Sequence, residues 1–228
     1  MLHNMTRETA RGRGLMTYLV GAKETIYLII ISVLLTPFLA MWHEMGHFIV
    51  IKILGGDAII NPTNVWPTAD FYIQLTQAQR TLITAGGPIF DFLIFATAAT
   101  LLCLRRFKVL NQTTTIYEKC LFFFSLLSMM WVIEPIYYLF FWDKKYKNLD
   151  EIKIAEGLGL DLFSLLWIMF AVGGIISYFA LKHWPKKRRF FDTITVGASV
   201  YLSLMMWVYW LGPFLKMIYR AVRHKLTG

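Results

Sequence analysis

Two histidines and one glutamate lie within five residues of each other, in the sequence His43-Glu44-Met45-Gly46-His47. Residues four positions apart share one face of a helix, so both imidazoles can reach a single metal ion while Glu44 lies beside it. Zinc bound by two histidines and one carboxylate keeps a position for water and lowers the pKa of that water to about 7. Glu44 is then expected to take the proton of this water and to deliver it to a leaving amine.

This motif supplies two of the three protein ligands that such a zinc site needs. The other three histidines lie in polar tails or in a basic loop, which disfavours them as ligands: His3, His183 and His224. The third ligand is therefore expected among the acidic residues of the chain: Asp91, Glu134, Asp143, Asp150 and Asp161.

The composition places this motif in a membrane protein. Of the 228 residues, 57% are hydrophobic and 16% are charged, whereas soluble domains carry about 25% charged residues. The 37 aromatic residues (18 Phe, 11 Tyr and 8 Trp) exclude a disordered chain, and two cysteines exclude a disulfide framework. The net charge of +9 comes from short basic clusters between apolar runs, so we expect contact with a lipid bilayer and no nucleic-acid partner.

Five apolar runs are long enough to cross about 30 Å of hydrocarbon as helices. They are residues 25–51, 82–104, 121–142, 162–181 and 190–215. The sequence therefore predicts an all-α polytopic membrane protein. The histidine motif lies about 27 Å from Thr25 along the first helix, at 1.5 Å per residue, which places it inside the far edge of the membrane. Ionisable groups on so apolar a helix are costly to bury and usually mark a function.

The segments outside these runs complete the predicted organisation. We expect a polar N-terminal tail, a membrane-embedded core, a basic loop with the last helix, and a basic C-terminal tail, at residues 1–24, 25–181, 182–215 and 216–228. Residues 55–80, inside the core, contain paired glycines, two prolines and the β-prone stretch 71–73. These are turn and strand signals, and they predict a small β-hairpin packed against the helices. Gly86 and Gly87, and likewise Gly173 and Gly174, are expected to serve helix packing.

The motif and the elements that follow it resemble the site-2 protease family of intramembrane zinc metalloproteases, in the short form without an inserted PDZ-like domain. The resemblance covers most of residues 26–166. HEMGH at 43–47 matches the HExGH of the family, AGGPIFD at 85–91 is similar to its AGPxxN element, and NLDE at 148–151 is similar to its late aspartate motif. The resemblance implies that His43, His47 and Asp150 bind zinc and that Glu44 is the catalytic carboxylate.

Two acidic residues depart from the pattern of the family. Asp91 and Glu134 stand where the family usually has asparagine, and Asp150 follows Glu134 by 16 residues, which is longer than the common spacing. Asp143 and Glu134 itself therefore remain alternative third ligands. Asp91 and Glu134 also have two other interpretations, either as protonated or paired carboxyls inside the helix bundle, or as groups that bind the backbone of an extended substrate.

The resemblance implies a zinc-dependent intramembrane endopeptidase that acts on membrane-spanning or membrane-adjacent proteins. The protein is then an integral, multi-pass membrane protein, in the cell membrane if the chain is prokaryotic. Its substrate must unwind before cleavage, and we expect it to pair by strand addition with the hairpin around residues 71–73. The alternative is a non-enzymatic transporter or assembly subunit with a structural or vestigial metal site, in which Asp91 and Glu134 line an ion path. The sequence indicates no oligomeric state.

Overall fold

The computed structural model describes residues 2–61, 64–108, 114–141 and 149–207, together with 209, 213 and 214. This part of the chain is mostly α-helical and contains one antiparallel pair of strands. The elements are α1 Leu2–Ile53, β1 Ala58–Asn61, β2 Asn64–Pro67, α2 Ala69–Gln74, α3 Gln77–Lys108, α4 Ile116–Leu126, α5 Met129–Phe141, α6 Asp150–Leu158, α7 Leu162–His183 and α8 Arg189–Met206. The predicted fold class, all-α with a small hairpin, is confirmed.

Within the described residues, four helical stretches are long and apolar enough to cross a membrane. They are Gly21–Ile53, Gln77–Arg105, Ile116–Phe140 and Leu162–His183, and they coincide with the first four predicted runs. The fifth predicted run, 190–215, begins as α8, and its residues 208, 210–212 and 215 lie outside the described residues. α8 is not among the four stretches, and its first turn carries the charged residues Arg189 and Asp192.

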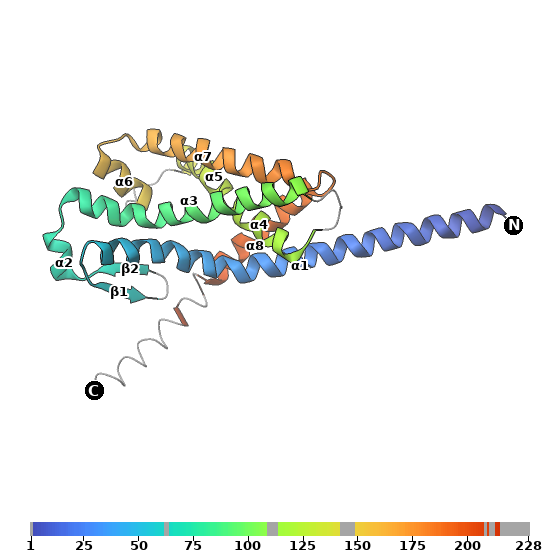
Figure 1. Ribbon diagram of the computed structural model, residues 1–228, viewed down its shortest axis with the longest axis horizontal. Helices are drawn as coiled ribbons and strands as arrows, with labels where there is room; N and C mark the ends of the chain where they lie inside the picture. Colours follow the sequence, from blue (N-terminus) through green and yellow to red (C-terminus); the bar gives the residue numbers. More distant parts are fainter. Residues whose placement is uncertain are drawn as a thin grey trace, which may run out of the picture.

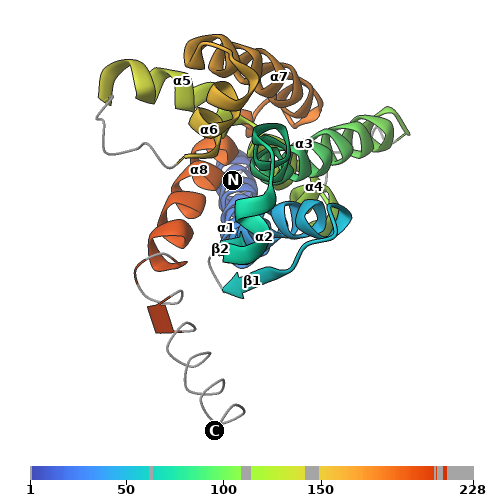
Figure 2. The same ribbon diagram turned by 90° about the vertical axis from the view of Figure 1, so that its left-hand side faces the viewer.

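α3 is the central helix of the bundle. It packs against α1, α4, α6 and α7, while α8 packs against α1 and α5 packs against α7 (Figures 1 and 2). The hairpin, α2 and α6 lie together at one end of the bundle, at the left of Figure 1, and the connection between α7 and α8 lies at the opposite end.

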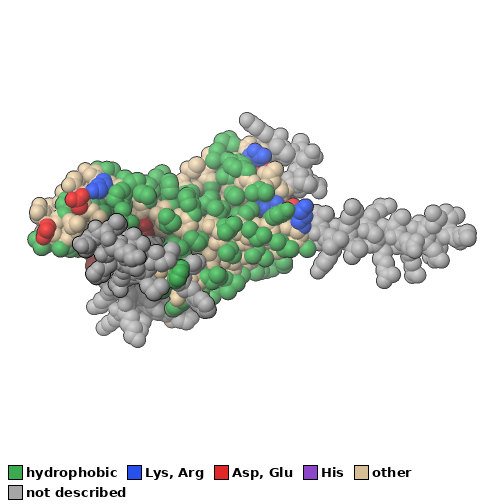
Figure 3. All heavy atoms as spheres, turned by 90° about the horizontal axis from the view of Figure 1, so that it is seen from below, with side chains coloured by type: hydrophobic (Ala, Val, Ile, Leu, Met, Phe, Trp, Pro, Cys, Tyr) green, Lys and Arg blue, Asp and Glu red, His purple; other side chains and the backbone are tan. Residues whose placement is uncertain are grey.

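Many large apolar side chains lie on the surface of the bundle as well as in its core. Phe122 and Trp184 stack inside the bundle with ring centroids 4.0 Å apart. Figure 3 shows hydrophobic side chains over the middle of the molecule and charged side chains at its ends. Large apolar side chains such as Leu34 and Trp167 are more than half exposed. Monomers in water rarely expose so much contiguous apolar surface, and an apolar belt between charged ends suits a lipid bilayer.

The third predicted run is interrupted between α4 and α5. The Ser128 hydroxyl at the interruption lies 2.7 Å from the carbonyl oxygen of Ser125 and 2.7 Å from the Ser177 hydroxyl of α7. A Cβ atom at Gly173 would lie 2.5 Å from the Ser128 carbonyl oxygen. The packing interpretation is therefore confirmed for Gly173 but not for Gly174, where a Cβ atom would meet nothing within 4 Å in the described part of the chain. The side chain of Ser128 thus ties the break between α4 and α5 to α7.

Two segments differ from the sequence-based expectation. Residues 71–73, which were predicted as strand, belong to α2. Thr68 precedes this helix and Asp70 lies in its first turn, where acidic side chains stabilise a helix N-terminus. The strands lie earlier in the chain, with Ile60 opposite Val65. α1 begins at Leu2, so helix runs through most of the segment predicted as an N-terminal tail, which contains no proline to end it.

Candidate metal centre

α1 carries the histidine motif in about its last three turns and ends in a glycine cap. Gly55 has a φ of 80°, a backbone conformation that glycine adopts without strain. The N–H of Gly55 donates to the Lys52 carbonyl, and the N–H of Gly56 donates to the Ile51 carbonyl, both at 3.0 Å. This pattern satisfies the final carbonyls of the helix. It turns the chain into β1, so the hairpin folds back beside the motif.

Glycines bring α1 and α3 into backbone contact at the motif. A Cβ atom at Gly46 would overlap the backbone of Gly86, and a Cβ atom at Gly86 would lie 2.6 Å from the Gly46 carbonyl oxygen. Close by, the indole N–H of Trp42 donates to the Phe90 carbonyl at 2.8 Å. The packing interpretation of Gly86 is thus confirmed. This contact places the next residues of α3 against the imidazole rings.

Gly87 faces the two imidazole rings themselves. A Cβ atom there would lie 2.7 Å from Nε2 of His47 and would overlap Nε2 of His43. Gly87 therefore keeps open the space in front of both Nε2 atoms. This role differs from the helix packing that the sequence predicted, because the atoms nearest to the Cβ position of Gly87 belong to the imidazoles of His43 and His47.

α6 carries Asp150 to the same point. Asp150 is the first residue of this helix, and a carboxylate at a helix N-terminus is stabilised by the helix dipole. Further along α6, a Cβ atom at Gly157 would overlap the side chain of Thr81 on α3. The missing side chain at Gly157 thus lets α6 lie directly on α3. This packing sets the position of Asp150 along α3, beside the two histidines.

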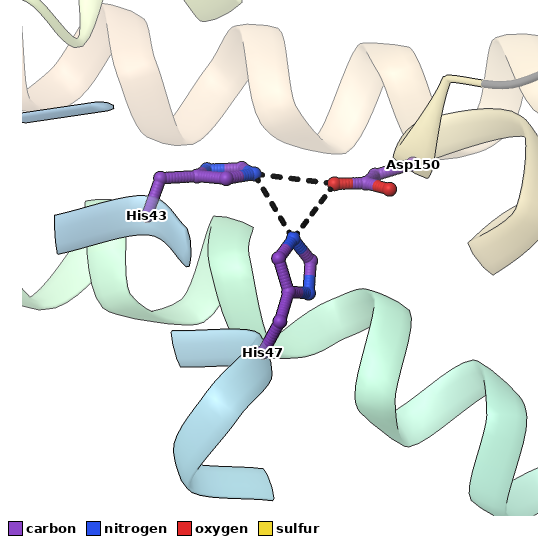
Figure 4. Close-up of side chains that lie close together, drawn as sticks. All are labelled: His43, His47 and Asp150. Atoms are coloured by element: carbon purple, nitrogen blue, oxygen red, sulfur yellow. Dashed lines mark hydrogen bonds and ion pairs between the residues drawn. The ribbon is translucent and has the colours of Figure 1, made fainter. Parts of the chain in front are cut away.

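His43, His47 and Asp150 form an equilateral triangle of potential ligand atoms (Figure 4). Nε2 of His43, Nε2 of His47 and Oδ2 of Asp150 are each 3.2 Å from the other two. Ligand atoms at about 2.0–2.1 Å from a tetrahedral zinc ion are roughly 3.3 Å apart. The triangle therefore has the size of one face of such a site, and the three residues can hold a metal ion.

Hydrogen bonds at the two Nδ1 atoms fix the orientation of the imidazole rings at this centre. Nδ1 of His47 lies 2.8 Å from the Ile83 carbonyl oxygen, and Nδ1 of His43 lies 2.7 Å from Oδ2 of Asp91. Both oxygens accept hydrogen bonds, so each Nδ1 carries the donated proton, and in a neutral imidazole Nε2 then offers a lone pair. Three acceptors without a proton face one another at the centre. Their mutual repulsion is relieved by a cation, so the donor set fits a bound metal.

Asp150 is held in its ionised form. Burial raises the pKa of its carboxyl, but hydrogen bonds with His43 and His47 outweigh this effect and hold the pKa below the usual range. These hydrogen bonds need a proton on the imidazole Nε2 atoms, and a bound metal takes the place of those protons. The carboxylate is the form that binds a metal.

Glu44 lies beside the triangle and is held by the hairpin. Its Oε2 accepts a hydrogen bond of 2.7 Å from the backbone N–H of Val65 on β2. Val65 packs in one apolar cluster with Ile51, Leu75 and Ile83, which fixes β2 against α1 and α3. The sequence contains no signal for this contact, because it depends on how the hairpin folds onto α1.

The remaining acidic candidates lie in different positions. Glu134 of α5 is not part of the triangle, and its electrostatic neighbour is Glu151. Burial raises the pKa of the Glu151 carboxyl. Asp143 lies outside the described residues. Asp161 accepts a hydrogen bond from the Ser164 N–H and caps α7. Among the described residues, Asp150 is thus the carboxylate that completes the triangle, and substrate binding by Glu134 stays a prediction.

No protein-family model, curated protein or solved structure matches this chain.

Proposed function

We propose that this chain is a multi-pass membrane protein that acts as a zinc-dependent intramembrane endopeptidase of the site-2 protease type. The observation that carries the proposal is the triangle of His43, His47 and Asp150, whose sides match the ligand spacing of tetrahedral zinc. The two nitrogens and one oxygen leave a fourth position free, which is the arrangement of catalytic zinc sites. Structural zinc sites instead close the coordination with a fourth protein ligand.

In this proposal each residue has one task. His43, His47 and Asp150 bind the zinc ion, and when bound it supplies Lewis acidity that acidifies water and polarises a peptide carbonyl. Glu44 accepts a proton at its carboxylate and returns it to the leaving amine. The Val65 N–H orients the Glu44 carboxylate by the hydrogen bond to Oε2. Gly87 leaves room for the ion and for a reacting group in front of the imidazoles.

The surroundings of Glu44 favour a peptide substrate. Because the Val65 N–H donates to Glu44, it points away from β1, and the edge of β2 that carries it is not paired with another strand in this two-stranded sheet. Such an edge can pair with an extended peptide by strand addition. A substrate strand on this edge lies next to the metal centre. The pairing strand is thus β2 in this proposal, in place of residues 71–73, which are helical.

The test of this function compares wild type with Glu44→Gln in liposomes. The full chain is reconstituted with a panel of single-span peptides that carry glycine and proline near their centres, and products are identified by mass spectrometry. Wild type cleaves at least one peptide. Glu44→Gln keeps its zinc but loses roughly 10²- to 10⁴-fold in rate, the usual contribution of a general acid–base group. Glu156→Gln on the exposed side of α6 is the control and keeps the wild-type rate.

Two results would contradict the proposal. The first is cleavage by Glu44→Gln at the wild-type rate, which would remove the assigned role of this carboxylate. The second is a zinc-loaded wild-type protein that leaves every peptide of the panel intact, which is the behaviour of a transporter or assembly subunit with a structural metal.

A further inference from the structure

We propose that Asp91 is a positioning residue that orients His43 for metal binding and does not contact the substrate. This inference deepens the proposed function, on which it rests for the presence of the metal. It assigns Asp91 a different role from the substrate binding that the sequence predicted.

The geometry joins Asp91 to the ring and to the open space in front of it. Oδ2 of Asp91 lies 2.7 Å from Nδ1 of His43. Asp91 follows Gly87 by four residues on α3, so the two residues share the helix face that meets α1. One turn of α3 thus leaves space for the metal at Gly87, and the next turn holds the ring that binds it.

The other partners of Asp91 also indicate a role in the metal site. Its Oδ1 is buried and makes no hydrogen bond within the described part of the chain. In that part, the hydrogen-bonding partner that the structure gives to this carboxylate is the imidazole of His43, and the Glu151 carboxyl interacts with it through charge alone. The neighbouring Phe90 carbonyl is bound by Trp42, which fixes the local position of α3 against α1.

The two histidines are held by unlike partners, and this difference makes the proposal testable. His47 donates to a backbone carbonyl, at Ile83, which no substitution removes. His43 donates to a side chain, which can be replaced. A carboxylate acceptor fixes the tautomer and raises the basicity of the opposite nitrogen, and loss of such a partner typically costs about 10–100-fold in metal affinity. An asparagine at position 91 retains the shape but not the charge.

The experiment measures zinc affinity in the purified full chain, by competition with a chelator of known affinity. Asp91→Asn is expected to bind zinc about 10–100-fold more weakly than wild type, and Asp91→Ala at least as weakly. The absorption bands of bound Co²⁺ are expected to shift in both variants, because Asp91→Asn removes the charge behind the His43 ring and Asp91→Ala removes the hydrogen-bond acceptor itself. Asp70→Asn, the same change at an exposed position of α2, is the matched control and binds zinc like wild type.

The outcomes separate this inference from the function on which it rests. Wild-type zinc affinity and an unchanged Co²⁺ spectrum in Asp91→Asn would overturn the positioning role, and a raised KM in that variant would then assign Asp91 to the substrate. A wild-type protein that binds no zinc would overturn the proposed function itself. If Asp91→Ala does not fold, the near-isosteric Asp91→Asn decides the question.

Discussion

Gly87 is the residue whose missing Cβ atom leaves space beside both histidines of the candidate metal centre. The space that its missing side chain leaves lies against Nε2 of both His43 and His47. Those nitrogens are fixed from behind, by Asp91 and by the Ile83 carbonyl, so neither ring turns away without losing a hydrogen bond. At the residue scale, the centre depends on an absent Cβ atom as much as on the ligands.

Gly87→Ala is therefore expected to abolish metal binding while all three ligands remain. The added Cβ atom competes with the ion for the same space, so the loss of zinc affinity exceeds the roughly 10–100-fold of a lost ligand partner. Equilibrium dialysis against zinc provides the measurement. Gly197→Ala on α8, where a Cβ atom meets nothing within 4 Å, is the control. Full zinc binding by Gly87→Ala would show that the ion does not lie in front of these nitrogens.

The sequence predicts the three candidate ligands better than it predicts the hydrogen bonds that hold the motif in place. The spacing of His43 and His47 is a local helical property, so it can be read directly. Asp150 follows from the resemblance to the site-2 protease family. The contacts of Asp91 and Val65 with the motif depend on how α3 and the hairpin pack on α1, and no local spacing encodes them.

Among the helices, the position of Asp150 at the centre depends on how α6 packs against α3. This contact is made where Gly157 meets Thr81, two turns from Asp150 along a helix of nine residues. A displacement of the helix at Gly157 is thus transmitted to the carboxylate. The sequence predicts the long elements well, and the run 162–181 appears as α7, Leu162–His183. It does not predict short ones, since the β-prone residues 71–73 form helix in α2.

Gly157→Ala is expected to weaken zinc binding through α6. The added Cβ atom overlaps the Thr81 side chain and moves Asp150 away from the histidines, with a loss in affinity of about 10-fold or more. The double variant Thr81→Ala/Gly157→Ala removes the overlap and is expected to restore binding, as measured by chelator competition. A double variant as weak as the single one would refute this coupling.

At the scale of the whole molecule, a second polar cluster lies at the end of the bundle opposite the metal centre. Asp192 is 1% exposed and accepts hydrogen bonds from Trp184 Nε1 at 2.7 Å and from Arg188 at 3.0 Å. Lys119 of α4, which is 2% exposed, forms an ion pair with Glu24 of α1 at 2.5 Å. A guanidinium nitrogen of Arg188 also lies 3.6 Å from a carboxylate oxygen of Glu24, so these contacts join α1, α4 and the start of α8 where the bundle meets the loop between α7 and α8 (Figure 1).

Asp192→Ala is expected to lower stability without changing the metal centre. Removal of one partner from a buried ion pair costs roughly 3–5 kcal/mol, an upper bound here because Arg188 is partly exposed. Thermal unfolding in detergent measures the loss, and zinc affinity of the folded fraction is expected to equal that of wild type. A large fall in zinc affinity in this variant would contradict the separation of the two ends.

The zinc content of the purified chain shows whether His43, His47 and Asp150 bind a metal ion together. Elemental analysis is expected to find one zinc ion per wild-type chain, none in His43→Ala or Asp150→Ala, and one in Glu134→Ala, because His43, His47 and Asp150 form the triangle and Glu134 does not. A wild-type chain without zinc, or an Asp150→Ala variant that keeps zinc while Glu134→Ala loses it, would contradict the account.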